Sequence, residues 1–422
     1  MKVLFITYYW PPAGGVSVQR ILHFVNNLSA LGVSCHVIYP ENASYYQTDQ
    51  TLKKQINSSI ILHPVPIKDL TSLIKKLPGQ AKEGNIKKSS KSFFSRLLKN
   101  VRANYFIPDP KINWVNPVVA KGRKIIETEH IDLIFTNGTP HSVHLAGMGL
   151  VNLTKLPWIA DFRDPWTRMD NFKYFPLNKS ALKKHQTLER KVIESANLTL
   201  TVSPSWADDF TELGARNSAH ITNGFDEIIE SIDSPEFIVS HVGSIHSDRD
   251  LNTFIDAFAK VAKSSNKSTR PWKLALVGNV DSSSLSYAKE KLNSDQLIVT
   301  GLVNHEAAKN WIARSSALLL PINKSIASKG RIPAKLFEYL SSGKPIILLG
   351  NKLGDAAKIL QKCNAGKAFD PDDRKGMEAY LTAVAEGQYK YDNNSEAIQQ
   401  YSRRHTAIQL HSKIKKLIDS NA

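Results

Sequence analysis

The chain has 422 residues but only two cysteines, Cys35 and Cys363, which stand far apart in the sequence. This scarcity excludes a disulfide-based scaffold and a cysteine-rich metal site, because both need several closely spaced cysteines. The sequence also lacks an apolar run of about 18 residues, the length that a membrane-spanning helix needs. A chain of this length with ordinary apolar content predicts two globular domains.

The first residues, MKVLFITYYWPPAGG, do not have the features of a secretory signal peptide. They contain one lysine and a short apolar run, whereas a signal peptide needs a longer apolar stretch and a small-residue cleavage site. We therefore expect this segment to form the first strand of a cytoplasmic protein.

Acidic residues are too few to balance the basic ones, since 38 Asp and Glu face 55 Lys and Arg, a formal net charge of +17. Such an excess predicts an acidic partner, such as nucleic acid, anionic lipid or a phosphorylated substrate. Basic residues are densest between Lys68 and Lys111, where Phe93, Phe94, Leu97, Leu98 and Val101 recur at helical spacing. This pattern predicts a segment that binds an anionic membrane surface at the inner face of the plasma membrane. A basic helix that packs its apolar face on its own domain explains it equally well.

Apolar strands alternate with helical patterns along the chain, which predicts an α/β architecture with doubly wound parallel sheets. The expected strands are 3–7, 33–39, 131–136, 157–162 and 198–202 in the first half, and 237–242, 274–277, 297–299, 318–320 and 346–349 in the second. The chain turns at residues 221–226, ITNGFD. We therefore expect an N-terminal Rossmann-like domain over 1–222, a second one over 223–394, and a helical tail over 395–422 that packs back on the first.

In such sheets, ligands bind at the carboxyl ends of the strands. Gly14 and Gly15 follow the first strand, where the absence of a Cβ lets the backbone approach a phosphate or a sugar. The spacing is not GxGxxG, so the dinucleotide-binding motif is absent. A tight turn that needs positive φ is the alternative explanation.

Charged and aromatic residues follow the strand 157–162, where Asp161, Arg163 and Asp164 stand between Trp158 and Trp166. Alternating carboxylates and a guanidinium suit the binding of hydroxyl groups, and either Asp could deprotonate an acceptor hydroxyl. We predict these three residues as catalytic and Trp166 as part of the acceptor site, with an internal ion pair as the alternative. His141 and His144 follow the preceding strand as acceptor-site candidates or as ordinary capping residues.

In the second half, Ser244 closes the strand 237–242 and Arg249 follows it, placed where a guanidinium could bind a diphosphate. A surface cation at a helix start is the alternative for Arg249. Val303 lies in a loop after the strand 297–299 whose backbone could contact a base.

The segment 328–350, SKGRIPAKLFEYLSSGKPIILLG, predicts a helix that begins at Pro333 and ends at Gly343, followed by a strand. Lys329, Arg331 and Lys335 crowd the start of this helix, where cations are unfavourable unless an anion joins them. Glu338 follows one turn later and suits sugar hydroxyls. The combination points to a nucleotide-sugar, and a solvated basic loop is the alternative.

These motifs resemble the family 4 glycosyltransferases, which are retaining enzymes of the GT-B fold. The resemblance covers nearly the whole chain and rests on PPAGG with Arg20 on the next helix, on ADFRDPW, on NGFD and on PAKLFEYLSSGKP. It implies two Rossmann-like domains that face a central cleft. It also implies a nucleoside-diphosphate sugar as donor. The sequence shows no cluster of metal ligands, so we expect no metal cofactor.

The resemblance assigns roles by position. Glu338 matches the second Glu of the family's E-x7-E motif, which holds the ribose, and Arg249 matches the basic residue at the diphosphate. Gly14 and Gly15 match the glycine loop that faces the donor phosphates, and the stretch 331–335 matches the loop over them. Three positions depart from the family pattern: Gly330 replaces the first Glu, Ser244 stands where many members have Arg, and Arg163 with Asp164 stands where many have His.

We therefore predict a retaining glycosyltransferase that acts on a glycan or lipid-linked acceptor in cell-surface polysaccharide biosynthesis (capsule, O-antigen or exopolysaccharide). Two rivals share the fold, a nucleotide-sugar epimerase and an inactive glycan-binding homologue. A nucleic-acid-binding protein is a rival from another class, but no nucleic-acid motif accompanies the positive charge.

Overall fold

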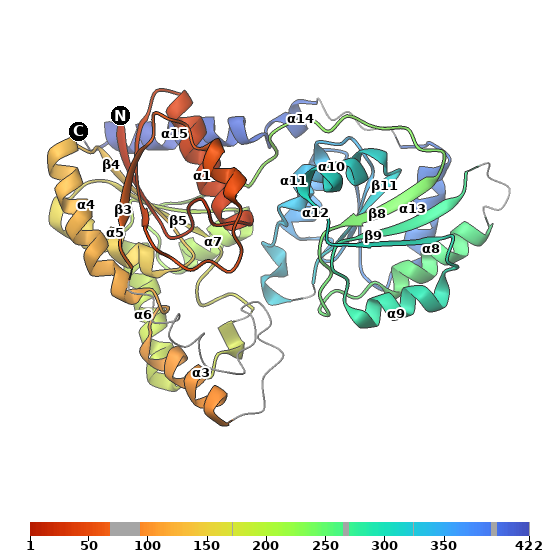
Figure 1. Cartoon of the computed structure of the whole chain (residues 1–422), viewed down its shortest axis with the longest axis horizontal. Coiled ribbons are helices and arrows are strands. Elements are labelled where there is room, and N and C mark those ends of the chain that lie inside the picture. The colour runs from red at the N-terminus through yellow and green to blue at the C-terminus, as the bar shows by residue number, and fades with distance from the viewer. Residues whose placement is uncertain (68–92, 171, 265–269, 324, 390–394, 422) are drawn as a thin grey trace. The chain divides into compact units, whose positions relative to one another are not determined.

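The computed structural model describes residues 1–67, 93–170, 172–264, 270–323, 325–389 and 395–421. The chain divides into two compact units. Unit 1 comprises Met1–Thr222 together with Thr406–Ala422, and unit 2 comprises Asn223–His405. Figure 1 shows a twisted sheet with helices on both faces in each unit.

Unit 1 contains a seven-stranded, fully parallel sheet in the order β3-β2-β1-β4-β5-β6-β7. Its central strands β1, β4 and β5 are almost entirely buried, as expected where helices cover both faces of a sheet. The strands are β1 Lys2–Thr7, β2 Ser34–Pro40, β3 Ile61–Val65, β4 Leu133–Asn137, β5 Trp158–Arg163, β6 Leu198–Thr201 and β7 Ser218–His220.

Alternate residues of β1 serve two different cores of unit 1. Val3 and Phe5 face the core that α1 and the C-terminal helix α15 cover, whereas Leu4 and Ile6 face the core under α4, α5 and α6. The helices of this unit are α1 Val16–Ala30, α3 Phe93–Tyr105, α4 Val115–Glu129, α5 Ser142–Thr154, α6 Lys179–Ser195 and α7 Pro204–Glu212. The helix α15 Arg403–Asp419 belongs to this unit from Thr406 onwards. Short 3-10 helices also lie here, η1 Gln50–Gln55, η2 Ile112–Trp114 and η3 Phe172–Tyr174.

Unit 2 contains a six-stranded parallel sheet in the order β10-β9-β8-β11-β12-β13. The strands are β8 Phe237–Val242, β9 Trp272–Val277, β10 Leu297–Gly301, β11 Ala317–Pro321, β12 Ile346–Leu349 and β13 Gly366–Phe369. The helices are α8 Asn252–Ser264, α9 Ser282–Lys291, α10 His305–Arg314, α11 Lys335–Leu340, α12 Asp355–Lys362, α13 Arg374–Ala385 and α14 Glu396–Gln399, with one 3-10 turn, η4 Ile326–Lys329.

Each strand that the sequence predicts overlaps an observed strand, and both sheets have the Rossmann-like order that the fold prediction requires. The edge strands β3, β7 and β13 were not predicted. They are short or partly exposed, so their residues do not form a long apolar run.

Two predicted boundaries need correction. The helix expected from Pro333 to Gly343 spans Lys335–Leu340, because residues 331–333 have non-helical backbone and residues 341–343 form a turn. The predicted tail 395–422 is divided between the units. Ile398 and Tyr401 pack into a core of unit 2, whereas Ala407, Leu410 and Ile414 pack into a core of unit 1.

Candidate functional site

In both sheets the strand order reverses direction at one place, between β1 and β4 in unit 1 and between β8 and β11 in unit 2. The crevice at the carboxyl ends of the strands beside such a reversal is where ligands bind in open α/β sheets. Most of the residues that the sequence singles out follow these strands or their neighbours.

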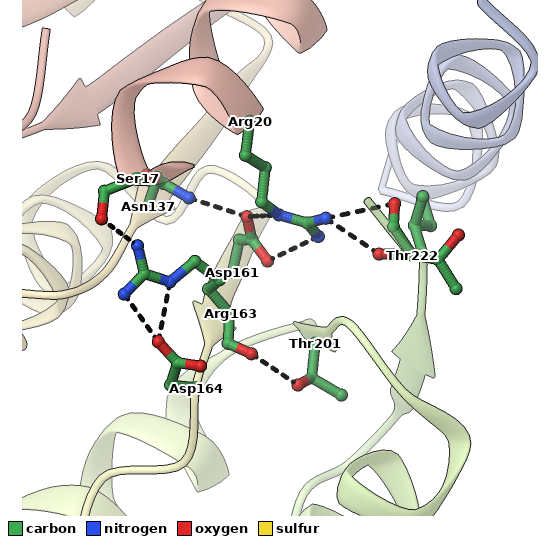
Figure 2. Close-up of polar contacts among 9 residues, drawn as sticks. Ser17, Arg20, Asn137, Asp161, Arg163, Asp164, Thr201 and Thr222 are labelled. Carbon is green, nitrogen blue, oxygen red and sulfur yellow. Dashed lines mark hydrogen bonds and ion pairs between the residues drawn. The ribbon is translucent and has the colours of Figure 1, made fainter. Parts of the chain in front are cut away.

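The first feature of unit 1 is a buried ion pair between α1 and the end of β5 (Figure 2). Arg20 donates from Nε to Asp161 Oδ2 and from Nη2 to Asp161 Oδ1, both over 3.0 Å. Asn137 Nδ2 donates to Asp161 Oδ2 over 2.8 Å, and Arg20 Nη1 donates to the carbonyl of Ile221 over 2.9 Å. Asp161 is fully buried, and three donors already engage its oxygens. The internal ion pair is therefore the explanation that the geometry supports for Asp161, rather than contact with an acceptor hydroxyl.

Arg163 lies beyond this pair and faces the start of α1 (Figure 2). Its guanidinium donates to Ser17 Oγ, to Thr139 Oγ1 over 3.2 Å and from Nε to Asp164 Oδ2 over 2.8 Å. Burial lowers the pKa of Arg163, but the Asp164 carboxylate together with Tyr9 and Asp161 raises it, so the net pKa lies above the ordinary value. The Arg163 and Asp164 side chains are 16% and 29% exposed. The ion pair of Arg163 with Asp164 is therefore partly accessible at the carboxyl end of β5.

His141 lies beside Arg163, and a stack of rings supports it. The His141 ring is parallel to the ring of Trp166 with centroids 4.8 Å apart, and Trp166 Nε1 donates to His185 Nδ1 over 3.0 Å. Burial and the charge of Arg163 lower the pKa of His141 to about 3, so the ring is neutral near pH 7. Trp166 is 3% exposed, so it backs His141 and does not present its ring to an acceptor.

His144, the other histidine candidate, lies in the core of unit 1. Its Nδ1 forms a 2.8 Å hydrogen bond with Thr136 Oγ1, and its ring stacks on Phe162. The side chain is fully buried. A structural role is therefore the explanation that its surroundings support.

The glycine loop at the end of β1 is held by a second loop. Gly14 N donates to the carbonyl of Gln47 over 2.9 Å, and a Cβ on Gly14 would come within 3.0 Å of Gln47 Cγ. Gly15 caps α1 with φ of 89°, a conformation that other residues rarely adopt. The turn therefore explains Gly15 structurally, and the first turn of α1 that follows it carries Ser17, whose Oγ accepts from Arg163.

In unit 2 the central feature is a lysine that lies against a glycine. A Cβ at Gly243, which follows β8, would come within 1.9 Å of Lys335 Nζ. Any other residue at position 243 would therefore displace the ammonium group. Gly243 has φ of 135°, a second reason for glycine there. Lys335 is the first residue of α11, and its ammonium group lies at the carboxyl end of β8.

Arg249 adds a second positive charge at this edge. Its Nη1 donates to the carbonyl of Ser244 over 3.0 Å. Burial lowers the pKa values of both Arg249 and Lys335, and the charge of Arg249 lowers that of Lys335 further. In the described part of the chain, neither cation forms an ion pair with a carboxylate. Asp248 raises the pKa of Arg249 and Glu338 raises that of Lys335, but neither carboxylate lies within ion-pair distance, so these partly desolvated cations are suited to binding an anion.

The remaining cations of the motif differ in position. Arg331 is half-buried, and its charge lowers the pKa of Arg249, which places the two guanidinium groups near each other. Arg331 Nη1 also donates to Asn323 Oδ1 over 2.5 Å. Lys329 is exposed at the end of η4. The cation group at this edge therefore consists of Arg249, Arg331 and Lys335.

Glu338 lies one turn after Lys335 and is half-buried. Its negative charge raises the pKa values of Lys335 and Arg403, although burial lowers both overall. Ser244 is half-buried beside Arg249, and Val303 packs against the core of unit 2. The structure thus brings Ser244, Arg249 and Lys335 together, whereas Val303 follows the edge strand β10.

His241, which no sequence motif marks, lies fully buried on β8. Its Nδ1 forms a 2.9 Å hydrogen bond with the carbonyl of Leu319. Burial and the charges of Lys335 and Arg249 lower its pKa to about 3. The strand therefore adds no positive charge to the cation group near pH 7.

The described residues contain no group of three His, Cys, Asp or Glu side chains placed to hold a metal ion. No helix among them is long and apolar enough to cross a membrane. The basic stretch 68–92 of the predicted membrane segment lies outside the described residues.

Comparison with known families decides the classification. A model described as "Glycosyltransferase Family 4" matches residues 13–227, and one described as "Glycosyl transferases group 1" matches residues 236–386. The chain belongs to glycosyltransferase family 4. The resemblance inferred from the sequence motifs is thereby confirmed, and the protein is a glycosyltransferase of the GT-B fold.

Solved structures share this fold along the whole chain. TarM matches with a TM-score of 0.64 at 11% identity and covers 99% of this chain and 98% of its own. Sucrose-phosphate synthase from Thermosynechococcus elongatus matches at 0.63 and 13%, with 99% of both chains covered. The lipopolysaccharide outer core galactosyltransferase WaaB matches at 0.58 and 15%, also with 99% of both covered. None of the curated protein sequences matches this glycosyltransferase significantly.

The partners of the predicted residues were the part of the site that sequence reasoning missed. Ser17 and Thr139 hold Arg163, and Gly243 makes room for Lys335. Gly243 closes an apolar strand, a signal that could have marked it as a place of close approach. Ser17 stands 146 residues from Arg163 and carries no comparable signal.

Proposed function

We propose that this glycosyltransferase transfers a sugar from a nucleoside-diphosphate sugar to a hydroxyl of a glycan or lipid-linked acceptor, with retention of the anomeric configuration. The observation that carries the proposal is the cation group of unit 2. Arg249 and Lys335 are partly desolvated and lack a carboxylate partner in the described residues. A diphosphate supplies the missing negative charge and accepts their hydrogen bonds.

In this proposal the residues at the carboxyl-terminal edge of each sheet have a separate role. In unit 2, Arg249, Arg331 and Lys335 bind the diphosphate, and Glu338 accepts hydrogen bonds from the ribose. In unit 1, the loop of Gly14 and Gly15 faces the donor, and Arg163 with Asp164 and neutral His141 positions the acceptor hydroxyl.

The chemical step forms a bond from the acceptor oxygen to the anomeric carbon and breaks the bond from that carbon to the diphosphate. The acceptor proton leaves with the diphosphate. Stabilisation of the departing charge by the three cations and alignment of the acceptor supply the rate enhancement, so no strong general base is needed. No metal cofactor is required either, and activity in the presence of EDTA tests that part.

We further propose that the acceptor belongs to cell-surface polysaccharide biosynthesis at the cytoplasmic face of the membrane. WaaB, whose fold this chain shares, is named as a lipopolysaccharide outer core galactosyltransferase. The net charge of +17 is compatible with work close to anionic lipid.

The first experiment is a thermal-shift panel with UDP, GDP, ADP and dTDP and their common sugars, on the wild type and on Glu338→Ala. We expect one nucleotide to raise the melting temperature, and the variant to lose most of that shift. A product analysis by NMR with the donor so identified then reports the anomeric configuration. No shift with any nucleotide would favour the inactive glycan-binding alternative instead.

A further inference from the structure

Exposed aromatic side chains gather at one end of unit 1, where α3 lies beside the start of α6. Of the five exposed aromatic residues among the described side chains, three belong here: Tyr105 at 78%, Tyr174 at 55% and Phe175 at 38% exposure. The aliphatic side chains of Val101 and Leu182 are also exposed here, each at 38%. Figure 1 shows this end as a projection of α3 and α6 away from the sheet. We call these residues and the lysines described next the α3–α6 tip.

Hydrogen bonds connect the two helices of the tip, α3 and α6. Asn104 on α3 donates from Nδ2 to the carbonyl of Pro176 over 2.8 Å, and its Oδ1 accepts from the backbone N–H of Asn178 over 2.8 Å. Asn178 in turn caps α6 by accepting from Ala181 N over 2.8 Å. One side chain therefore fixes α3 to the loop and to the helix that carry the other exposed residues.

Below the surface, rings anchor the loop that bears the exposed aromatics. Phe172 contacts His185 edge to face with centroids 5.1 Å apart, and it lies 6.1 Å from the ring of Phe175. His185 accepts a hydrogen bond from Trp166, whose ring supports His141. The tip and the candidate acceptor residue thus share one packed network.

The charge of the tip has one sign. Exposed basic residues lie on the same two helices as the aliphatic residues, namely Lys99, Arg102, Lys179, Lys183 and Lys184. The stretches 99–105 and 172–184 contain no Asp or Glu. Cations around protruding apolar groups match an anionic lipid surface, since the lysines attract the headgroups while the apolar groups enter the interface.

We propose that the α3–α6 tip is the surface by which this glycosyltransferase binds an anionic membrane. Its apolar members include Val101 and Leu182, which cannot stack on nucleobases, and its tyrosines are of the kind that sits at headgroup level. The proposal deepens the proposed function, on which it rests for the lipid-linked acceptor. It also assigns membrane contact to described residues that lie mostly outside the segment predicted from the sequence.

The test is co-sedimentation of the full-length protein with vesicles of phosphatidylcholine containing phosphatidylglycerol, and with vesicles of phosphatidylcholine alone. One variant replaces Lys179, Lys183 and Lys184 by Gln, and a second replaces Tyr174 and Phe175 by Ser. The matched control replaces Lys53, Lys54 and Lys124 by Gln, three exposed lysines of unit 1 outside the tip. Thermal unfolding verifies that each variant is folded.

We expect the wild type to sediment only with the anionic vesicles. Each lysine near such a surface contributes a factor of roughly five in partition, so the tip lysine variant should bind about a hundredfold more weakly. The aromatic variant should also lose binding, whereas the control should lose less than tenfold.

Equal binding by the tip variants and the wild type would overturn the proposal, as would sedimentation that disappears only when residues 68–92 are deleted. Binding to a DNA oligonucleotide but not to vesicles would also overturn it and assign the charge to nucleic acid. The nucleotide-induced thermal shift reports on the proposed function separately, because no tip residue belongs to the donor site. Its failure with intact vesicle binding would leave the membrane surface standing.

Discussion

The charged side chains at the carboxyl-terminal edges of the two sheets differ in how they are paired. In unit 1, Arg20 is paired with the buried Asp161, and Arg163 is paired with Asp164. In unit 2, the described carboxylates leave Arg249 and Lys335 without an ion pair. Buried charges that compensate each other hold a fold in one arrangement, whereas uncompensated cations carry a desolvation cost that an incoming anion relieves. The comparison assigns positioning to the first edge and anion binding to the second.

The largest expected effect comes from breaking the buried ion pair between Arg20 and Asp161 in unit 1. Asp161→Ala leaves Arg20 buried without its carboxylate, so we expect the free energy of unfolding of unit 1 to fall by about 3–5 kcal/mol. Urea denaturation followed by tryptophan fluorescence measures the change.

The matched control for this variant is Glu127→Ala, which breaks the exposed pair with Arg123. It should change the free energy of unfolding by less than about 1 kcal/mol. If Asp161→Ala were as stable as the wild type yet inactive, Asp161 would have the catalytic role that the sequence predicts, and the contrast between the edges would fail.

A smaller effect is expected from removing an uncompensated cation. Lys335→Met deletes a charge-assisted hydrogen bond to the diphosphate, worth about 1.5–3 kcal/mol, so the dissociation constant of the donor should rise by about 10–150-fold. The free energy of unfolding should stay the same or rise, because the replaced ammonium group is partly desolvated. Calorimetric titration with the nucleotide identified by the thermal-shift panel measures the first quantity, and urea denaturation measures the second.

Lys375→Met is the control in the same unit, since Lys375 is exposed and lies on α13. It should alter neither quantity. Unchanged donor affinity in Lys335→Met would remove Lys335 from the donor site.

The smallest expected effect, taken for one histidine over one pH unit, is the loss of stability in acid that the two units share. The pKa values of His141 and His241 lie at about 3 and that of His185 at about 4, because burial disfavours their charged forms. The unfolded chain binds protons at these positions below about pH 6.5 while the native protein does not. Stability is therefore complete above that pH and falls as the pH decreases from about 6.5 towards 4.

Each such histidine contributes a slope of up to about 1.4 kcal/mol per pH unit. Urea denaturation of the wild type and of His185→Gln between pH 7.5 and 5 measures the slopes. We expect a shallower slope in the variant, and identical slopes would show that His185 does not contribute.

The sequence alone determined much of the fold and the outline of the site. Apolar runs of strand length, helices at 3.6-residue spacing and glycine stops are local signals, so they placed the central strands of both sheets and the division near residue 222. The cations at 249, 331 and 335 were also recognisable, since unfavourable charge near a helix start is visible in the sequence.

Only the tertiary structure decided which charges are compensated. Asp161 stands 141 residues from Arg20, and no local pattern predicts that the two meet in a buried ion pair. The close approach of Lys335 to Gly243 likewise depends on the parallel order of the strands, which brings residues about 90 positions apart to one edge. Local sequence preferences identify the helices and strands. The pairing of distant strands in a sheet decides which side chains meet, and therefore which carboxylate is buried in an ion pair and which is accessible.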